Sequence, residues 1–394
     1  MHGAIASQTA VIVDAIRTGS GKGKPGGSLS GIHPADLLAG VLTQLLERNG
    51  LESTQIDDVI AGCVSQAGEQ TGNIGRTALL SAGFDQTVPG MTVDRQCGSS
   101  QQAAAFAAQT IMAGVNDVVI AAGVESMSHV PLGSAVGAQN LYGVGIRARY
   151  PEGLVNQGVS AELVAAKWGL SREQLDAFSA ESHRRAAQAW AEGAFANEIV
   201  PVGEFVTDET VRPTTTAEVL AGLPVSFRTD ELAARFPDIA WSITAGNSSP
   251  LTDAASAALI MSESRAQQWG LTPRARFHSF AVVGDDPLYM LTGPIPATHR
   301  ILERSGLSFS DLDVYEVNEA FAPVPLAWAH EFDADPAKLN PRGGAIALGH
   351  AVGSSGTRLL ASMLNHLEAT GGRYGLQLMC EGGGTANATI IERL

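Results

Sequence analysis

The chain has 394 residues, of which 45% are hydrophobic and 16% are charged, and it contains 44 glycines. This composition predicts a globular protein of two or three domains with a large core and excludes a disordered chain. A net charge of −15 without any run of Lys or Arg argues against a nucleic-acid partner, so a polyanionic ligand needs local positive groups or helix N-termini.

Strands and helices alternate from the start of the chain. In order, we expect a strand at residues 9–15, an amphipathic helix at 34–49, a strand at 58–63, a helix at 73–82 and, after the stretch around Cys97, a strand at 117–122. The loop at 19–31 contains GSGKGKPGG, but its GK lacks the GxxxxGK[ST] spacing and no helix follows directly, so we discount a nucleotide phosphate loop. The run DVVIAA at 117–122 is typical of a strand buried on both faces of a parallel sheet. The alternation predicts an α/β fold.

The stretch VDRQCGSSQQAAAFAAQTIMAG reads as a strand end, a tight turn at Cys97 and an alanine-rich helix that stops at Gly114. A thiol at the start of a helix lies close to free N–H groups and to the positive end of the helix dipole, and both stabilise the negatively charged thiolate. We therefore predict that the pKa of Cys97 is lowered and that Cys97 is a nucleophile. The alternative is a small buried apolar cysteine, which is common for an unpaired Cys.

The composition and the predicted secondary structure change between residues 123 and 242. A stretch rich in Gly and Ala precedes two predicted helices at 159–168 and 172–192, and an irregular region with four prolines follows. We interpret this segment as an insertion carried on the first domain. It holds most of the clustered positive charge, namely Arg147, Arg149, Lys167, Arg184, Arg185, Arg212 and Arg228.

The last third of the chain repeats the first. LLERNGL at 45–51 matches ILERSGL at 301–307, IDDV at 56–59 resembles LDV at 312–314, and CGSS starting at Cys97 matches VGSS starting at Val352. The matches keep their order and a nearly constant separation, which chance rarely produces. We predict two copies of one α/β unit that pack about a pseudo-twofold axis.

Four loops of the two copies carry reactive side chains after predicted strands. They hold Cys97, His350 in GGAIALGHAVGSSG, Asn318 in NEAF, and Cys380 followed by Gly382 in CEGGG. Open α/β sheets place their sites at the carboxyl ends of strands, so we expect these loops to converge. A histidine can take the proton of one thiol, the second thiol can move a proton to or from carbon, and Asn318 and the glycine backbone can donate to oxyanions.

Several classes of site and location are disfavoured. Three cysteines are few and odd in number for a secreted protein, which favours a reducing cytoplasm, and they form no CxxC pair, so we expect no metal site. No apolar run reaches the about 20 residues of a membrane span. The start MHGAIASQTAV lacks a charged segment before an apolar core, so we also expect no signal peptide.

Taken together, these motifs resemble the thiolase family of acetyl-CoA acyltransferases and acetyltransferases. The similarity covers almost the whole chain and rests on IVDAIRT, CGSSQQA, GVESMS, TAGNSS, TGPIPA, NEAFA, GGAIALGH and CEGGG. It implies a five-layered α-β-α-β-α fold of two duplicated halves, residues 1–123 with 243–272 and residues 273–394, and an inserted loop domain at 124–242 that binds coenzyme A (CoA). It also implies a homodimer or homotetramer that uses CoA as co-substrate and has no tightly bound cofactor.

The same resemblance implies roles for single residues. Cys97 is the acylated nucleophile, His350 activates it, and Cys380 handles the proton on the acetyl carbon. Asn318 positions a water that forms one oxyanion hole with His350, and the N–H groups of Cys97 and Gly382 form the other. The residues matching CoA or acyl contacts are Ser249 near the pantetheine, Arg212 near the adenine, Met290 in the acyl pocket, Gln157 and Phe321.

The sequence departs from the usual pattern around these positions. Asn156, Gln157 and Gly158 stand where acetoacetyl-specific relatives typically carry His-Met-Gly. Glu381 replaces an aliphatic residue and Thr385 replaces a methionine. These departures favour a degradative 3-ketoacyl-CoA thiolase for a substrate longer or bulkier than acetoacetyl-CoA. The alternatives are an acetoacetyl-CoA thiolase working in the condensing direction, a ketoacyl synthase, a Cys-His hydrolase and a non-catalytic acyl-CoA or lipid-binding protein of this fold.

Overall fold

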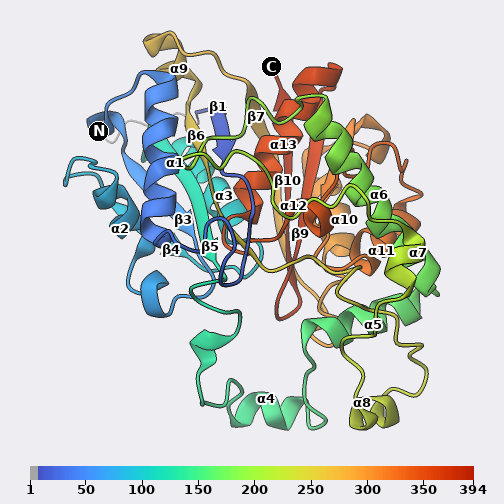
Figure 1. Ribbon diagram of the computed structural model, residues 1–394. Coiled ribbons are helices and arrows are strands. Elements are labelled where there is room, and N and C mark those ends of the chain that lie inside the picture. Colours follow the sequence, from blue (N-terminus) through green and yellow to red (C-terminus); the bar gives the residue numbers. More distant parts are fainter. Residues whose placement is uncertain (1–7) are drawn as a thin grey trace.

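Two copies of one strand and helix unit stand side by side in the computed structural model, which describes residues 8–394 (Figure 1). The strands of the first copy are β1 (Ala10–Arg17), β3 (Asp58–Gly62), β4 (Gly90–Val93), β5 (Val118–Ser126) and β6 (Thr252–Ser262). Those of the second copy are β7 (Ala275–Gly284), β8 (Val314–Val317), β9 (Tyr374–Glu381) and β10 (Thr385–Arg393). The short β2 (Gly21–Lys22) pairs with β6.

The strand order confirms the predicted duplication. Hydrogen bonds join the strands in the order β4-β3-β5-β6-β1-β7-β10-β9-β8. Counted outward from the junction of β1 and β7, the strand order is β1, β6, β5, β3 in the first copy and β7, β10, β9, β8 in the second. Strands at the same place in the two orders, such as β6 and β10, are equivalent in the two copies. The junction is short and consists of Val11 with Arg276 and Ile12 with Ala275.

The strands of each copy form one sheet layer, and the two layers are joined only at the short β1–β7 junction. Helices form three further layers, one between these two sheets and one on the outside of each. The middle layer holds α3 (Ser99–Met112) and α13 (Ser355–Thr370), which share one buried cluster with both sheets. The first sheet is covered on its outside by α1 (Pro34–Asn49) and α2 (Ile74–Ser81), and the second by α10 (Pro294–Ser305) and α11 (Pro323–Phe332). This is the expected α-β-α-β-α arrangement. The remaining helices of the two copies are α9 (Glu263–Trp269), α12 (Ala345–Leu348), η1 (Ser53–Gln55), η2 (Gly68–Gln70) and η4 (Phe309–Asp311).

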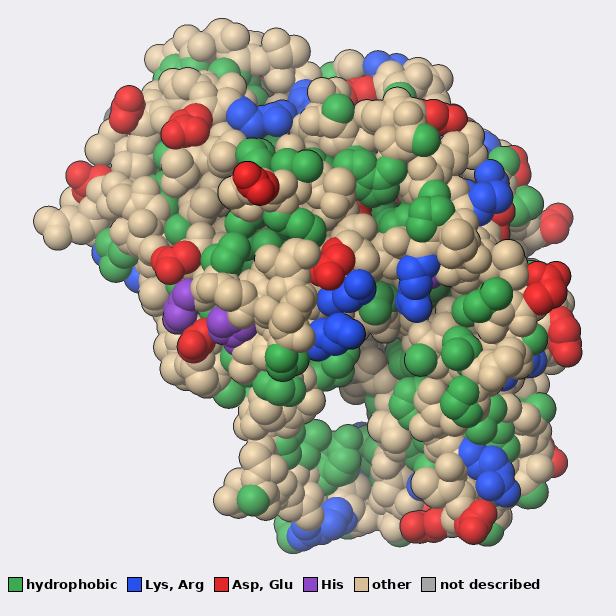
Figure 2. Space-filling model, in the orientation of Figure 1, with side chains coloured by type: hydrophobic (Ala, Val, Ile, Leu, Met, Phe, Trp, Pro, Cys, Tyr) green, Lys and Arg blue, Asp and Glu red, His purple; other side chains and the backbone are tan. Residues whose placement is uncertain are grey.

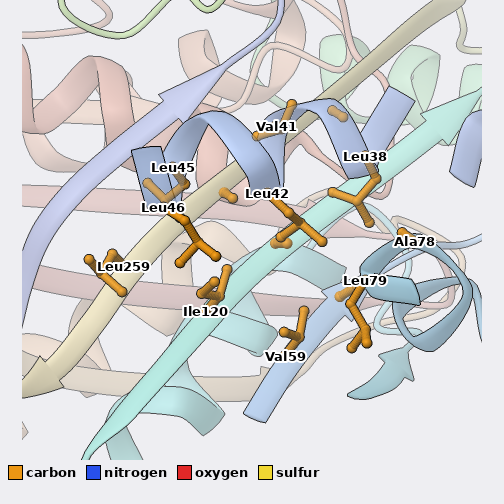
Figure 3. Close-up of a cluster of buried hydrophobic side chains, with 14 of the residues drawn as sticks. Leu38, Val41, Leu42, Leu45, Leu46, Val59, Ala78, Leu79, Ile120 and Leu259 are labelled. Carbon is orange, nitrogen blue, oxygen red and sulfur yellow. The ribbon is translucent and has the colours of Figure 1, made fainter. Parts of the chain in front are cut away.

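The alternation of side chains along β5 explains why this strand lies at the centre of its sheet. Ile120 belongs to the outer cluster, together with Leu42 of α1 and Leu259 of β6 (Figure 3). Val119 and Ala121 belong to the inner cluster with α3. Successive side chains of a strand point to opposite faces, so an apolar run buries both. Each fully buried Leu or Ile contributes about 1.5–3 kcal/mol to stability.

The expectation of parallel sheets is correct for only part of the structure. Strands β4, β3 and β5 are parallel, as are β8 and β9, but β6 runs antiparallel to both β5 and β1, and β10 runs antiparallel to β9 and β7. The physical reason is the chain path. After β9 a three-residue glycine turn returns the chain directly as β10, and a hairpin of this kind joins only antiparallel strands.

The segment between β5 and β6 packs against both copies: Val200 joins the outer core of the first copy, and helices of the segment pack against the second. It contains η3 (Ser134–Val136), α4 (Val144–Arg149), α5 (Gln157–Lys167), α6 (Arg172–Ala191), α7 (Ala217–Ala221) and α8 (Asp230–Arg235). Val164 of α5 shares a core with Trp328 of α11, and Ala186 of α6 packs with Leu348. Figure 1 shows α4 and α8 at the end of the molecule toward which the β9–β10 turn points. Within the described residues, no helix has the length and apolar character needed to cross a membrane.

Candidate active site

Cys97 lies in the tight turn between β4 and α3, and its side chain is 5% exposed. The turn packs closely on its neighbours. A Cβ on Gly62, at the end of β3, would lie 2.3 Å from the backbone N of Ser100 and 2.7 Å from the carbonyl O of Gly353. Glycine is therefore required there for α3 and the second-copy loop to meet. Gln96, just before the cysteine, has a φ of +48°, a strained conformation for a residue with a side chain.

His350 follows α12 and is held by hydrogen bonds of its backbone and of its ring. Its backbone N–H donates to Thr252 Oγ1 (3.0 Å), and its Nδ1 lies 2.6 Å from Ser355 Oγ. The Ser355 hydroxyl is also 2.9 Å from the carbonyl of Ala351, so it can donate there and accept from Nδ1–H. This arrangement leaves Nε2 unprotonated, which is the form that accepts a proton.

The predicted loops converge around Cys97. The backbone N–H groups of Gly382 and of Cys97 itself lie close enough to the Cys97 sulfur to lower its pKa. Cys97 also shares a small buried cluster with Val352, two residues from His350, and with Met379, next to Cys380. The Nδ2 of Asn318 lies 3.4 Å from His350 Nε2, and the N–H of Asn318 donates to Leu378 on the strand of Cys380 (3.0 Å). The four loops therefore meet at one buried site.

The predicted direction of the Cys97 pKa is wrong. Burial, followed by the negative charge of Glu381, raises the pKa of the Cys97 thiol to about 12, although the N–H groups of Cys97 and Gly382 lower it. The helix N-terminus is present, but removal of the thiol from water has the larger effect. The resting thiol is neutral, so its proton must leave as the sulfur attacks, and a nearby base is needed.

The other two titratable groups are also neutral at rest. Burial, and then the positive charge of Arg358, lowers the pKa of His350 to about 3. Burial, and then the charges of Cys97 and Glu381, raises the pKa of Cys380 well above its usual value. The site thus holds an unprotonated imidazole and a protonated second thiol, which match a proton acceptor and a proton donor.

The lowered pKa of His350 has a consequence for stability. Below pH 6.5 the unfolded chain binds a proton on this histidine and the folded chain does not, so stability falls as pH decreases from 6.5 toward 3. We expect the loss from this residue to be about 1 kcal/mol at pH 5.5. In thermal unfolding, His350→Asn should lose less stability than the parent between pH 7.5 and 5.5. The exposed His330→Asn is the control and should follow the parent; an equal loss in all three proteins contradicts the assignment.

Arg212 lies in a surface hollow of about 450 Å³ with Lys22, Lys24 and Leu251. The other lining residues are Gly23, Thr210 and Pro250. In Figure 2, basic side chains gather beside the opening that separates the α4 segment from the body of the molecule. The lining does not include Cys97 or His350. One lining residue, Leu251, precedes Thr252, which accepts the hydrogen bond from His350.

The other predicted contact residues lie nearer the thiols. The N–H of Ser249 donates to Ala320 of the NEAF loop (3.0 Å). Met290, with a φ of +54°, and Phe321 share a buried cluster with Cys380. The amide of Gln157, at the start of α5, borders Gly382, since a Cβ there would lie 3.3 Å from Gln157 Nε2.

Sequence reasoning missed residues that hold this site together. Thr252 and Ser355 orient His350, and Glu125 joins the two copies by accepting hydrogen bonds from the N–H groups of Ser65 (2.9 Å) and Gly353 (3.0 Å). Phe227 of the insertion meets Phe321 edge to face at a ring distance of 6.1 Å. Glu125 lies within GVESMS and Ser355 within the repeated GSS, but nothing in the sequence pairs them with their partners.

No group of three or more His, Cys, Asp or Glu side chains in the part of the chain that the structure describes is arranged to hold a metal ion. The three cysteines there, Cys63, Cys97 and Cys380, are buried and form no disulfide.

Comparisons with known proteins agree over the whole chain. Residues 10–264 match the family described as "Thiolase, N-terminal domain", and residues 271–393 match "Thiolase, C-terminal domain". The steroid 3-ketoacyl-CoA thiolase FadA6 of Mycobacterium tuberculosis is 48% identical over 405 residues, with 100% of this chain and 96% of the relative covered. A 3-ketoacyl-CoA thiolase of Escherichia coli is 43% identical and covers 98% of this chain and 99% of its own. The crystal structure of the Bacillus anthracis acetyl-CoA acetyltransferase superposes with a TM-score of 0.88 at 38% identity, over 99% of this chain and 100% of that one.

Proposed function

The chain belongs to the thiolase family, and from this premise we propose that it is a 3-ketoacyl-CoA thiolase that cleaves its substrate with CoA through an acyl group on Cys97. The observation that carries the proposal is the meeting of Cys97, His350 and the Cys380–Gly382 loop at one buried site. Claisen cleavage needs a nucleophile, a base, an acid and oxyanion donors, and this site supplies all four.

In the first half-reaction the sulfur of Cys97 attacks C3 of the 3-ketoacyl-CoA while His350 Nε2 takes the thiol proton. The backbone N–H groups of Cys97 and Gly382 donate to the oxygen on C3. The C2–C3 bond then breaks and its electrons move to C2, where the enolate oxygen is held by His350 and by a water on Asn318. The thiol of Cys380 gives its proton to C2, and acetyl-CoA leaves. Each well-placed oxyanion donor contributes about 3–4 kcal/mol.

In the second half-reaction the thiol of CoA attacks the acyl carbon on Cys97. Its proton restores the thiol of Cys380, and the departing Cys97 sulfur regains its proton from the His350 imidazolium. A shortened acyl-CoA is released. Because the acyl group is held covalently between the two CoA-binding steps, the kinetics should be ping-pong. CoA is a co-substrate in this scheme, and no tightly bound cofactor is needed.

We propose that the phosphates of CoA contact Arg212, Lys22 and Lys24 in the hollow described above. A protein of net charge −15 needs such local positive charge to attract an anion. Arg212→Gln and the double variant Lys22→Gln/Lys24→Gln should each raise KM for CoA about 10-fold, as expected for loss of charge-assisted hydrogen bonds, and leave kcat within about 3-fold.

The matched control for this prediction is Arg228→Gln. Arg228 is exposed on the same insertion, and its ion-pair partner there is Asp230. Its KM should equal that of the parent. Measurement at two salt concentrations adds a second criterion, because the effect should shrink as salt rises. An unchanged KM for CoA in both charge variants contradicts the proposed phosphate contacts.

For the acyl group we propose a substrate bulkier than acetoacetyl-CoA. Support comes from Gln157 beside Gly382 and from Phe227 facing Phe321, together with the similarity to a relative named for steroid substrates. A panel of 3-ketoacyl-CoA substrates, from acetoacetyl to long, branched and ring-bearing acyl groups, tests this. The highest kcat/KM is expected for a bulky member, and a preference for acetoacetyl-CoA contradicts it.

We also propose a cytoplasmic homo-oligomer. A reducing compartment keeps Cys97 and Cys380 as thiols. Strand β4 is the outermost strand of the first sheet among residues 8–394, and Met91 on it is 43% exposed. An open edge with an apolar side chain favours pairing with a second chain. Light scattering on the purified protein should give the mass of a dimer or a tetramer, and the mass of a monomer contradicts the proposal.

A further inference from the structure

Glu381 and Thr385 contact each other beside Cys97. They are the two strand residues that flank the glycine turn between β9 and β10, and they pair across it. The hydroxyl of Thr385 donates to Glu381 Oε2 at 2.7 Å. Glu381 is 0% exposed.

The second oxygen of this carboxyl faces the turn that carries the nucleophile. A Cβ on Gly98 would lie only 1.9 Å from Glu381 Oε1, so the carboxyl packs directly on the backbone of the residue after Cys97. Among residues 8–394, no group donates a hydrogen bond to this oxygen. A buried carboxylate without a full set of partners is costly, whereas a neutral carboxylic acid is tolerated.

The charges around Glu381 do not compensate for its burial. From the loop before α3, Asp94 opposes its ionisation and Arg95 favours it, and the hydrogen bond from Thr385 also favours the ionised form. The thiols of Cys97 and Cys380 lie close enough that a charge on Glu381 raises the pKa of both, and Glu125 acts in the same sense on Cys97. Burial is the largest effect and raises the pKa of Glu381 to about 8.

We propose that Glu381, held by Thr385, is a positioning residue for Cys97: its neutral carboxyl supports the Gly98 turn, and its ionisation opposes the negative charge that Cys97 must develop. The inference rests on the proposed role of Cys97 as the nucleophile. It goes beyond that role because it says that Glu381, which does not itself react, makes Cys97 less reactive at alkaline pH than it would otherwise be.

The test is the rate at which iodoacetamide alkylates Cys97 between pH 6.5 and 10, with the labelled cysteine identified by peptide mass spectrometry. This measurement does not depend on thiolysis. The role of Glu381 can therefore be disproved while the proposed function stands, and the proposed function can be disproved while the role of Glu381 stands. In the parent, the rate should rise with pH, flatten in part near pH 8, where Glu381 ionises, and then rise again at higher pH. In Glu381→Gln the rise should continue, so that the variant matches the parent at pH 6.5 and is about 10-fold faster at pH 9.5, equivalent to one unit of thiol pKa.

Two further variants keep the test decisive. Thr385→Val removes the hydrogen bond that favours ionised Glu381, so the flattening should move to higher pH. Glu231→Gln makes the same change on the exposed helix α8 and should follow the parent. A uniform change of rate at all pH values in Glu381→Gln would indicate a structural role only and would overturn the proposal. So would an unchanged profile in both Glu381→Gln and Thr385→Val, or the absence of labelling at Cys97 at every pH.

Discussion

Cys97→Ser is expected to reduce kcat for thiolysis of 3-ketoacyl-CoA by about 10⁴- to 10⁶-fold, the range seen when an enzyme nucleophile is removed. Burial and Glu381 already raise the pKa of the native thiol to about 12. A serine hydroxyl is a weaker acid and a poorer nucleophile in the same surroundings, so the covalent step should fail. The measurement is release of acetyl-CoA under saturating CoA.

The matched control for this prediction is Cys63→Ala. Cys63 is also a buried free cysteine and belongs to the outer core of the first copy, outside the proposed machinery. Its variant should keep kcat within about 10-fold of the parent. Retention of parental activity by Cys97→Ser, or an equal loss in Cys63→Ala, would contradict the assignment of the nucleophile.

Cys380→Ala is expected to separate the two half-reactions. The raised pKa of Cys380 keeps it a protonated donor near neutral pH, and its removal leaves the C2 carbanion without an acid. Carbon–carbon cleavage should fall by about 10²- to 10⁴-fold, the usual contribution of a general acid. Exchange of labelled CoA into a saturated acyl-CoA breaks no carbon–carbon bond, so Cys380 keeps its proton and His350 can carry the proton between Cys97 and the CoA thiol. The exchange rate should therefore stay within about 10-fold of the parent.

Cys97→Ser is the comparison for the exchange assay, since it should lose both reactions. Exchange of deuterium from solvent into the methyl group of acetyl-CoA gives a second readout, because it requires the acid and base at C2 but no cleavage. That exchange should disappear in Cys380→Ala. If cleavage and acyl exchange fell by the same factor, the role of Cys380 in proton transfer to carbon would be contradicted.

Much of the fold follows from the sequence because it depends on patterns that repeat. The match between the segments after residues 45 and 301 predicts two copies of one unit, and the strand orders on either side of the β1–β7 junction agree. The alternating apolar residues of β5 predict burial on both faces. The direction of each strand is harder to predict from the sequence. It depends on whether the chain returns by a short turn, as after β9, or by a crossover helix.

The location of most of the reactive residues was also predictable, because Cys97 precedes α3, Asn318 follows β8 and Cys380 lies near the end of β9. His350 instead follows the short helix α12. The protonation states of these residues were not predictable from the sequence. The sequence places Cys97 at a helix N-terminus, which favours the thiolate, but only the folded structure reveals its removal from water and the carboxyl of Glu381 nearby. Contacts such as Ser355 with His350 depend on side-chain geometry that spacing alone does not specify.

The central claim is a covalent acyl group on Cys97, and its direct test is the mass of the protein after mixing with a 3-ketoacyl-CoA in the absence of free CoA. The account predicts an added mass equal to the substrate acyl group shortened by two carbons, located on the peptide that contains Cys97, and its loss when CoA is added. An unmodified protein, or a modification on Cys63 or Cys380 instead, would contradict it.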